Sequence, residues 1–412
     1  MPLVSLRHLH AFSVVAATGG IRRSSEALYR ASSAVARSVA ALEHSLDVLL
    51  FERKGRGMLL TAAGQLARLR ADRIEAELRD VRDDAARLRE RQNARGTKGG
   101  AMPDHVSGSI DALLNERRLQ AAVLLAEVHH MPSVAHAMGT SQSAVSQAIA
   151  RLEDMLGQPL FLRTAHGMVP TDAGRRWVER FERVLAELRH IPEDIAALAG
   201  VVEGVVTVGA LPLARSQLLP GAIAAVLQKH PKLRIRSLES PYEELTAGLL
   251  SGRIDFIVGA LRAGAGDAFD TRVLIEDRVA LIARRGHPLA GKRRIRPADL
   301  AAYPWVLSRA GSPLRESLEA FFRSQGTVPP QPAVETGDLA LLRGLLVESD
   351  MLTALSAHQL HYEIETSQLA VLPYDMAGHD RSIGLITRRN AHLSPGAGAL
   401  LDEIDSTSRR WR

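Results

Sequence analysis

The first half of this sequence occurs twice, at a constant offset of 110 residues. Ser33-Ala34-Val35 returns as Ser143-Ala144-Val145, and Leu50-Phe51 returns as Leu160-Phe161. The alignment of the two copies needs no gap. Two copies are too few for a solenoid, which needs at least three stacked repeats. The sequence therefore predicts a small domain that has been duplicated within one chain.

Each copy is predicted to contain short helices followed by a hairpin-like loop. In the second copy, a tight turn at Gly139–Ser141 precedes a helix over about 142–156, with Ser141 as its N-cap. Val145, Ile149 and Leu152 fall on one face of that helix, and polar residues occupy the other. This pattern is typical of a helix-turn-helix, whose second helix enters the DNA major groove. A helical hairpin that binds nothing is the alternative for a single helix pair, and the duplication weighs against it.

Candidate DNA-binding residues are the outward side chains of the two recognition helices and the cations of the turn after each helix. Serine, glutamine and arginine can hydrogen-bond base edges, and cations in the turn can meet phosphates. In the first copy these residues are Ser32, Ser33, Arg37, Arg53, Lys54 and Arg56, and in the second copy they are Ser141, Gln142, Ser143, Ser146, Gln147 and Arg163. A solvated hairpin tip is the alternative for each turn.

Charge is distributed unevenly along the chain. Residues 1–100 hold 18 Lys and Arg against 11 Asp and Glu, a net charge of +7, whereas residues 101–200 have a net charge of −3. The remaining residues add +2. The first copy thus has the electrostatic footprint expected of a DNA-binding surface, although a basic solvated surface would give the same count.

Each copy ends in a helix with an apolar heptad stripe, over Ala67–Leu88 in the first and Trp177–Leu198 in the second. Such a stripe packs on another helix, as in a coiled coil. At 1.5 Å per residue it is about 30 Å long, more than a domain of this size covers. We expect the stripes to pair with each other inside one chain, or like with like between two chains. Pro192 predicts a kink or break in the second helix.

From Gly204 onward the pattern changes to short apolar runs that alternate with helices, and this alternation restarts after Val279–Ala283. It predicts parallel α/β sheets in two lobes, lobe I at about 203–260 and 376–410 and lobe II at about 262–374. Three loops place glycine, proline and hydroxyl residues where a strand leads into a helix. They suit a small anionic ligand, and ordinary helix capping is the alternative for each of them.

Several classes of protein are excluded or disfavoured. The chain has no cysteine, so disulfides, thiolate catalysis and cysteine-based zinc sites are excluded. The 15 histidines are scattered, and we find no nucleophile motif, phosphate loop or metal-ligand spacing. We therefore expect no enzyme, no catalytic residues, no cofactor and no metal. The apolar N-terminal run has a counterpart in the second copy, so we interpret it as a domain helix rather than a signal peptide, and we expect a cytoplasmic protein with no membrane partner.

At this point the residues resemble the LysR-type transcriptional regulators. The second copy carries Ser141–Ile149, Leu160-Phe161 and Thr171–Gly174 as that family does, and the C-terminal half is similar at Gly252–Asp255 and Gly286–Leu289. The stretches 208–212 and 259–262 look most like the galactose-binding-protein-regulator subgroup. Gln147 stands where the family usually has arginine, whereas the first copy keeps Arg37 but has Ser32 and Ala36 at two other positions. The family normally has one helix-turn-helix per chain, so the second copy is a departure.

The resemblance implies a multidomain chain: winged helix-turn-helix domains at 1–61 and 110–171, linker helices at 62–93 and 172–200, a flexible linker at 94–109 and an α/β, periplasmic-binding-protein-like effector domain at 201–412. It implies a regulator that binds double-stranded promoter DNA and forms a homodimer or homotetramer. A solute-binding protein of a transport system is the alternative. The implied effector, an organic acid first and a sugar second, would lie between the lobes at Leu211, Pro212, Ser216, Ser240, Tyr242, Arg309, Gly311, Ser312, Thr336 and Ser356.

Overall fold

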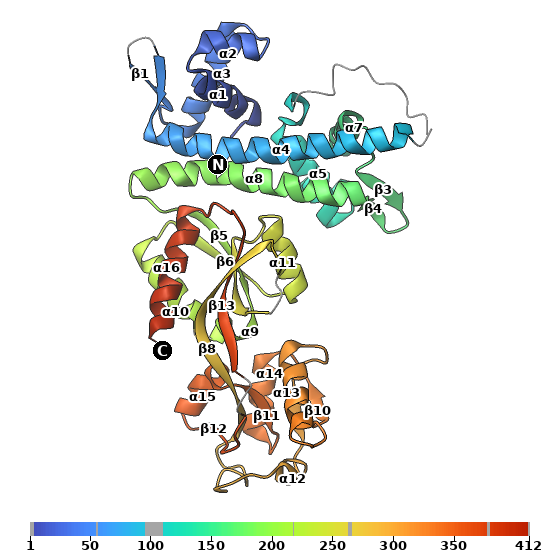
Figure 1. Ribbon diagram of the computed structural model, residues 1–412, viewed down its shortest axis with the longest axis vertical. Helices are drawn as coiled ribbons and strands as arrows, with labels where there is room; N and C mark the ends of the chain where they lie inside the picture. The colour runs from blue at the N-terminus through green and yellow to red at the C-terminus, as the bar shows by residue number, and fades with distance from the viewer. Residues whose placement is uncertain are drawn as a thin grey trace.

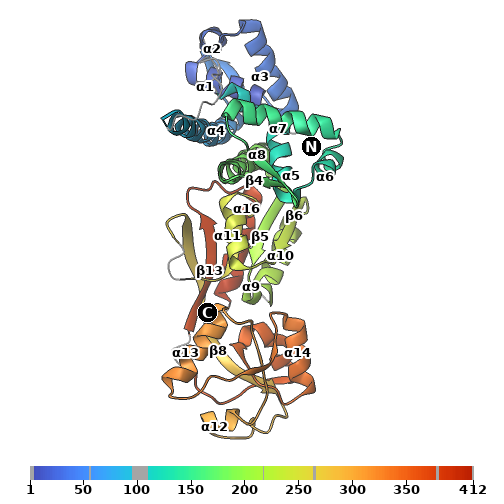
Figure 2. The same cartoon turned by 90° about the vertical axis from the view of Figure 1, so that its right-hand side faces the viewer.

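The computed structural model describes residues 4–54, 57–94, 110–216, 218–262, 266–376 and 380–410. Along the long axis of the molecule, the first helix-turn-helix unit lies at one end, the pair of long helices follows with the second unit beside it, and a two-lobed α/β domain extends to the other end (Figure 1, Figure 2). Most of the predicted flexible linker at 94–109 lies outside the described residues.

The two copies fold into the same unit. The first contains α1 (Leu6–Thr18), α2 (Ile21–Ala27), α3 (Ser32–Leu46) and the hairpin β1 (Phe51–Lys54) and β2 (Gly57–Leu60). The second contains η2 (Asp111–Leu113), α5 (Glu116–Val128), α6 (Met131–Ala137), α7 (Gln142–Leu156) and the hairpin β3 (Phe161–Thr164) and β4 (Gly167–Pro170). Both hairpins are antiparallel, and their registers differ by the same 110 residues.

Two long helices, α4 (Ala62–Ala94) and α8 (Asp172–Leu198), lie side by side and antiparallel (Figure 1), and are seen nearly end-on in Figure 2. The heptad stripe of α4 is rich in alanine, and it packs on bulky residues of α8 such as Trp177 and Phe181, both fully buried. Small residues on one helix therefore receive large residues from the other. The two stripes pair with each other inside one chain, which was the first of the two expected arrangements.

Ion pairs between α4 and α8 repeat the internal symmetry. Arg70 and Arg73 both contact Glu187. The residues 110 positions away do the same in reverse, because Arg180 and Arg183 both contact Glu77. The two helices are thus related by a local two-fold axis, as two chains of a symmetric dimer would be.

Pro192 does not break α8, which continues as one helix from Asp172 to Leu198. A proline inside a helix removes one backbone hydrogen bond and crowds the preceding turn. Here Leu188 and Ile191, before the proline, are buried in the joint core with α4, and Ile195, after it, packs against that core. Tertiary packing on both sides of the proline therefore holds the helix together. Of the expected kink or break, the break is wrong.

The C-terminal domain alternates strands and helices. Its elements are β5 (Gly204–Ala210), α9 (Pro212–Ser216), α10 (Leu218–Lys229), β6 (Leu233–Leu238), α11 (Tyr242–Leu250), β7 (Phe256–Ala260), β8 (Phe269–Arg284), α12 (Pro297–Leu300), β9 (Trp305–Leu307), α13 (Pro313–Ser324), β10 (Pro332–Glu335), α14 (Leu339–Glu348), β11 (Thr353–Ser356), η3 (Ala357–Leu360), α15 (His361–Glu365), β12 (Leu369–Val371), β13 (Asp380–Arg388) and α16 (Pro395–Arg409). The main sheet has the order β11-β8-β13-β7-β5-β6, with β12 also on β8.

The long strand β8 joins the two lobes. Residues 269–278 pair with β13 in lobe I, and residues 279–284 pair with β11 and β12 in lobe II. The crossing therefore lies within β8 and not near residue 262, where we expected lobe II to begin. Charged residues such as Asp270, Arg272 and Glu276 interrupt the apolar pattern of its first half, so only Val279–Ala283 was predicted as a strand.

Parallel pairing is also only part of the architecture. The pairs β5–β6, β5–β7 and β9–β10 are parallel, as the alternation of strands and helices predicts. All pairs made by β8 and the pair β13–β7 are antiparallel, because the chain returns between the lobes on adjacent strands. The sheets of the domain are therefore mixed.

Candidate DNA interface and effector pocket

Both recognition helices expose their predicted reading faces. Val35, Val39 and Leu42 of α3 are buried, as are the matching residues of α7. On the opposite faces, the candidate residues of both helices are exposed to solvent: Ser32, Ser33, Arg37, Ser141, Gln142, Ser143, Ser146 and Gln147. The two helices therefore present their polar faces outward, as contact with base edges requires.

The first turn of each recognition helix is built differently. Ser141 caps α7, because its Oγ accepts a hydrogen bond from the backbone N–H of Ala144 at 3.2 Å. In α3 the N-cap is Ala31, which has no side chain for this task. Ser32 instead donates to Oγ of Ser25 on α2, at 2.9 Å. The hydroxyl of Ser32 is thus already engaged within the first unit.

A glutamate in each recognition helix fixes the hairpin, or wing, beside it. Oε1 of Glu43 accepts the backbone N–H groups of Leu50 and Phe51, at 2.8 and 3.3 Å. Glu153 makes the same two bonds in the second unit, at 2.8 and 3.2 Å. These glutamates recur in the repeat, but the sequence alone does not indicate what they do. Their position sets the distance between recognition helix and wing.

Of the candidate cations in the two wings, the structure describes the side chain of only one. Arg163 is exposed on β3. Arg53 and Lys54 belong to the backbone of β1, but their side chains lie outside the described part of the chain, and Arg56 lies outside it altogether.

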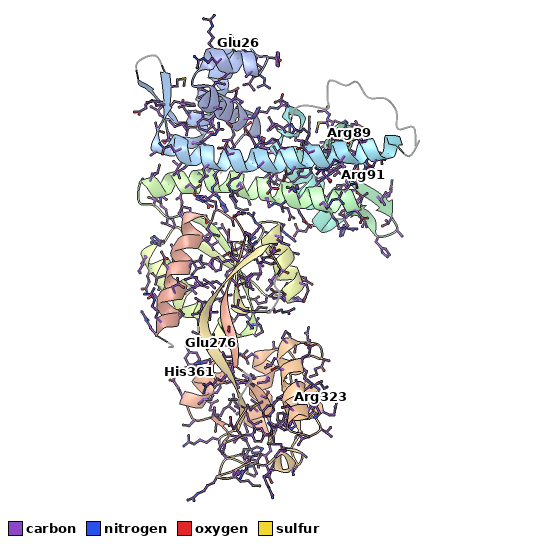
Figure 3. All side chains as sticks on the ribbon, in the orientation of Figure 1. Glu26, Arg89, Arg91, Glu276, Arg323 and His361 are labelled. Atoms are coloured by element: carbon purple, nitrogen blue, oxygen red, sulfur yellow. The ribbon has the colours of Figure 1, made fainter. Side chains whose placement is uncertain are left out.

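The second unit is also held by the end of α4. Figure 3 shows Arg89 and Arg91 near the C-terminal end of that helix, beside the second unit. Gly157 ends α7 with a φ of +66°, and a Cβ at this position would lie 2.9 Å from Cδ of Arg89. Both the backbone conformation and the close approach of the Arg89 side chain therefore favour glycine here.

A cavity of about 230 Å³ lies between the two lobes. Its wall consists of apolar residues interrupted by hydroxyl, amide and charged side chains. The lining residues are Leu211, Pro212, Leu213, Ala260, Leu261, Arg262, Ser308, Ser312, Pro313, Leu314, Thr336, Gly337, Asp338, Leu339, Leu342, Thr353, Ala354, Leu355 and Gln359. Of the ten predicted effector residues, Leu211, Pro212, Ser312 and Thr336 are among them.

The polar groups of this cavity mark the starts of two helices. Oγ of Ser312 accepts from the N–H of Arg315 at the start of α13, and donates to Oγ of Ser308 at 3.0 Å. Asp338 caps α14 by accepting from the N–H of Leu341 at 2.7 Å. Both capping interactions leave the remaining N–H groups of the first turns near the cavity, where an anion or a hydroxyl oxygen would be favoured.

Arg262 supplies positive charge at the cavity wall. Its guanidinium carbon lies 3.9 Å from the ring centre of Tyr242, and its Nη1 lies 2.8 Å from Oε1 of Glu243. Asp338 supplies negative charge on the other lobe. Arg262 and Asp338 had not been predicted. Asp338 follows β10 at a helix start, which is a recognisable capping signal, whereas nothing in the sequence indicates that Arg262 faces the cavity.

Six predicted effector residues do not line the cavity. Ser356 is fully buried, and its Oγ donates to Oδ1 of Asp277 at 2.5 Å, so its hydroxyl joins β11 to β8 where β8 passes between the lobes. Arg309 and Gly311 are exposed on the loop before α13. Ser216 ends α9, Ser240 lies on the loop after β6 and Tyr242 begins α11, all in lobe I. In the part of the chain that the structure describes, Oγ of Ser216 and the hydroxyl of Tyr242 are buried without a hydrogen-bond partner.

A buried ion cluster joins the long helices to the C-terminal domain. Arg70 is fully buried, and its guanidinium donates to Glu187 at 2.6 Å and to Asp194 at 2.7 Å. It also donates to the backbone carbonyl oxygens of His392 and Leu393, at 2.7 and 3.3 Å. One side chain of α4 thus holds together both long helices and lobe I.

A second buried cluster lies beside the first. Nε2 of His190 lies 4.0 Å from Oε2 of Glu193 and 3.8 Å from Oδ1 of Asp255 in lobe I. Burial lowers the pKa of His190 to about 3, and it raises the pKa of Glu193 to about 7 and that of Asp255 to about 6. The contact between α8 and lobe I therefore carries groups that change charge near neutral pH.

Among the described residues, no group of three or more histidine, aspartate or glutamate side chains is placed to hold a metal ion. Over the same residues, we find no helix with both the length and the apolar character needed to span a membrane.

Comparison with known proteins gives matches to both parts of the chain. Residues 199–409 match the LysR substrate binding domain, and residues 6–65 and 117–175 both match the bacterial regulatory helix-turn-helix protein of the lysR family. The transcriptional regulator GalR of Pseudomonas putida is 43% identical over 401 residues, which cover 97% of this chain and 96% of that protein. GbpR of Azospirillum brasilense is 27% identical over 73% of this chain and 88% of its own.

Solved structures show the same fold. CbnR, a LysR family transcriptional regulator, superposes with a TM-score of 0.52 at 20% identity, covering 71% of this chain and 99% of its own. Full-length OxyR from Pseudomonas aeruginosa gives a TM-score of 0.55 at 21% identity, over 72% and 94%. These proteins leave more than a quarter of this chain unmatched, whereas the match to GalR extends over almost all of it. On this evidence the chain belongs to the LysR family of transcriptional regulators, with DNA-binding helix-turn-helix units and an effector-binding domain.

Proposed function

We propose that one chain of this regulator forms a complete DNA-reading pair, in which its two helix-turn-helix units bind adjacent parts of one promoter site. The observation that carries the proposal is the antiparallel packing of α4 on α8 within the chain, with its two-fold related ion pairs. Two units held in this way have the symmetry with which a dimeric regulator meets two half-sites. Further assembly into a homodimer or homotetramer would place two or more such pairs on the DNA.

The two units of the pair have unequal tasks. The first has the positive charge, a net +7 over residues 1–100, whereas residues 101–200 have a net charge of −3. The second has two glutamines on its reading face, Gln142 and Gln147, both exposed on α7. Phosphate contacts supply most of the affinity and its dependence on salt, and base contacts supply sequence choice. The first unit therefore anchors the protein, and the second selects the sequence.

The effector is a small organic acid or a sugar, bound in the cavity between the lobes. Arg262 and the helix starts at α13 and α14 support a carboxylate, and the hydroxyls of Ser308, Ser312 and Thr336 support either ligand. Asp338 on the cavity wall suits the hydroxyl groups of a sugar or hydroxy acid. In this proposal the protein acts in the cytoplasm by binding DNA and effector, without catalysis. Binding alone accounts for every group described at the two sites.

Footprinting of the purified full chain on its own upstream DNA, with and without a panel of organic acids and sugars, tests this proposal. The wild-type protein should protect one site with two unequal halves, and one class of metabolite should change the pattern. Arg53→Ala should weaken binding to all sequences and reduce the salt slope by about 1. Gln142→Ala should cost about 1–3 kcal/mol on the protected site alone. If Gln142→Ala changes neither affinity nor sequence choice, the second unit does not read bases.

A further inference from the structure

Three turns of the helix-turn-helix units have left-handed backbone in both copies. At each of these turns, one copy has glycine and the other has a residue with a side chain. The φ angles are +75° for Gly19 and +58° for His129, +50° for Tyr29 and +60° for Gly139, and +52° for Asp47 and +66° for Gly157. Residues other than glycine adopt this conformation rarely, so each non-glycine partner needs a compensating interaction or a suitable side chain.

Two of the three substitutions are accounted for. His129 ends α5, and its Nδ1 lies 3.0 Å from the carbonyl oxygen of Met168, so the side chain is tied to the wing. Asp47 ends α3, and aspartate is among the residues that enter left-handed backbone most readily. Both residues close a helix, where a left-handed residue is common.

Tyr29 is not accounted for in this way. It is a bulky aromatic residue in the turn between α2 and α3, and 97% of its surface is exposed. Within the described residues its side chain makes no hydrogen bond and no ring contact. Packing inside the chain therefore does not offset the strain of its backbone. A strained residue without internal partners points to a role outside the chain.

The residue beside it supports the same conclusion. Arg30 is exposed and forms no ion pair among the described residues, and its counterpart in the second copy is Thr140. The turn of the first unit thus carries an aromatic hydroxyl and a cation, where the second carries glycine and threonine. Apart from Arg37, the candidate reading side chains of the recognition helix that follows are short, and the hydroxyl of Ser32 is bound to Ser25. The turn thus adds two long polar side chains beside a reading face that has one.

We propose that Tyr29 and Arg30 form a contact site for the phosphate backbone of duplex DNA, at the edge of the groove that α3 enters. The N-terminal end of a recognition helix points into the major groove, so the turn before it lies beside the flanking phosphates. The tyrosine hydroxyl donates to a phosphate oxygen, and the arginine pairs with a neighbouring phosphate. Glu26, which Figure 3 shows on α2, is on the outer end of the first unit, away from the C-terminal domain. The inference rests on the proposal that the first unit anchors the protein on DNA, and it names two residues that make the anchoring contacts.

The test exchanges each residue for its counterpart in the second copy. Tyr29→Gly and Arg30→Thr would be measured on two duplexes of equal length, one selected from a random pool by the wild-type protein and one of unrelated sequence. Tyr29→Gly should weaken binding to both about three- to tenfold while the thermal midpoint stays equal or rises, because glycine relieves the backbone strain. Tyr29→Phe should reproduce most of the loss. Arg30→Thr should reduce the slope of log affinity against log salt by about 1.

Tyr362→Ala is the control, because this tyrosine is also exposed but lies in lobe II. Its affinity should equal that of the wild type. Unchanged binding by Tyr29→Gly would overturn the proposal, as would a loss confined to the selected duplex, since phosphate contacts carry no sequence information. A loss accompanied by a lower thermal midpoint would assign Tyr29 a structural role instead. Gln142→Ala, measured in parallel, separates the outcomes: if it loses sequence choice while Tyr29→Gly binds normally, only the present inference fails.

Discussion

Ser312 combines a structural and a functional position in one side chain. It caps α13 and also lines the cavity between the lobes. Ser312→Trp should fill part of the cavity of about 230 Å³ and abolish the response to the effector, while DNA binding without effector stays unchanged. Loss of the cap costs about 1 kcal/mol, so the variant should remain folded. The measurement is DNA affinity with and without the effector found by footprinting.

Ser324→Trp is the matched control for this prediction, because Ser324 is exposed at the other end of the same helix. It should respond to the effector as the wild type does. A Ser312→Trp protein that responds with unchanged effector affinity would place the ligand outside this cavity.

Glu193 makes the stability of the protein depend on pH. Its pKa in the folded chain is about 7, raised from the ordinary 4.5 by burial, so the folded state binds a proton more tightly than the unfolded state does. The stability gained in this way is present below pH 4.5 and is lost as the pH rises through 7. Asp255 acts in the same direction as the pH rises through about 6. His190, with its pKa lowered to about 3, acts in the opposite direction, because stability is lost as the pH falls below 6.5.

Glu193→Gln should therefore raise the thermal midpoint at pH 8 but change it little at pH 5. The gain at pH 8 corresponds to about 1–3 kcal/mol, because the neutral amide avoids the cost of ionising a buried carboxyl group. Thermal unfolding of both proteins across this pH range measures it. Glu348→Gln, which alters an exposed carboxylate, should show the same difference from the wild type at both pH values. An equal effect of Glu193→Gln at pH 5 and pH 8 would contradict the role given to burial.

At the scale of single elements, the buried Arg70 joins α4 to α8 and to lobe I. Arg70→Met would leave Glu187 and Asp194 buried with their main partner removed, and breaking a buried ion pair from one side costs about 3–5 kcal/mol. Arg73 also contacts Glu187 but is partly exposed, so Arg73→Met should cost less than about 1 kcal/mol. Denaturant unfolding of the two variants gives the comparison. Equal losses would show that burial of Arg70 has no energetic consequence.

The elements also show how far sequence reasoning extends. The repeat and its heptad stripes predicted two matching units and a pair of long helices, because apolar periodicity is a local property that survives folding. Pro192 misled the prediction, since packing of its neighbours against α4 holds α8 together. The first half of β8 was missed because charged residues interrupt its apolar pattern, although the strand pairs with β13 along its length.

The candidate DNA interface was easier to predict from the sequence than the effector cavity, because only the former follows from local periodicity. The outward faces of α3 and α7 follow from helical spacing. The lining of the cavity does not, because it depends on which loop residues turn inward. Ser356 has the hydroxyl group expected of an effector-binding residue, but this hydroxyl donates a hydrogen bond to Asp277. Arg70 meets Glu187 and Asp194 at separations of 117 and 124 residues, and nothing local in the sequence indicates those partners.

At the scale of the whole molecule, the pairing of α4 with α8 can be tested because the chain has no cysteine. Gln92 near the end of α4 is exposed, Gln158 after α7 is half-buried, and the two are hydrogen-bonded to each other at 2.7 and 3.0 Å. A protein carrying Gln92→Cys and Gln158→Cys should be joined by a short bismaleimide within one chain. The product should keep the mass of a single chain, at a yield independent of protein concentration.

Each single variant, Gln92→Cys or Gln158→Cys, is the control and should give no internal product. A product of twice the chain mass, formed in greater yield at higher concentration, would show that these helices pair between chains.

The internal pairing has a consequence for how such a regulator behaves in a cell that contains many relatives. Regulators whose linker helices pair between separate chains can exchange partners with related chains, and their occupancy of DNA falls steeply on dilution because two molecules must first meet. In this protein the partner of α4 is covalently attached. The reading pair proposed here should therefore not exchange with that of another regulator, and site occupancy by one pair should rise with the first power of its concentration, even when only a few copies are present.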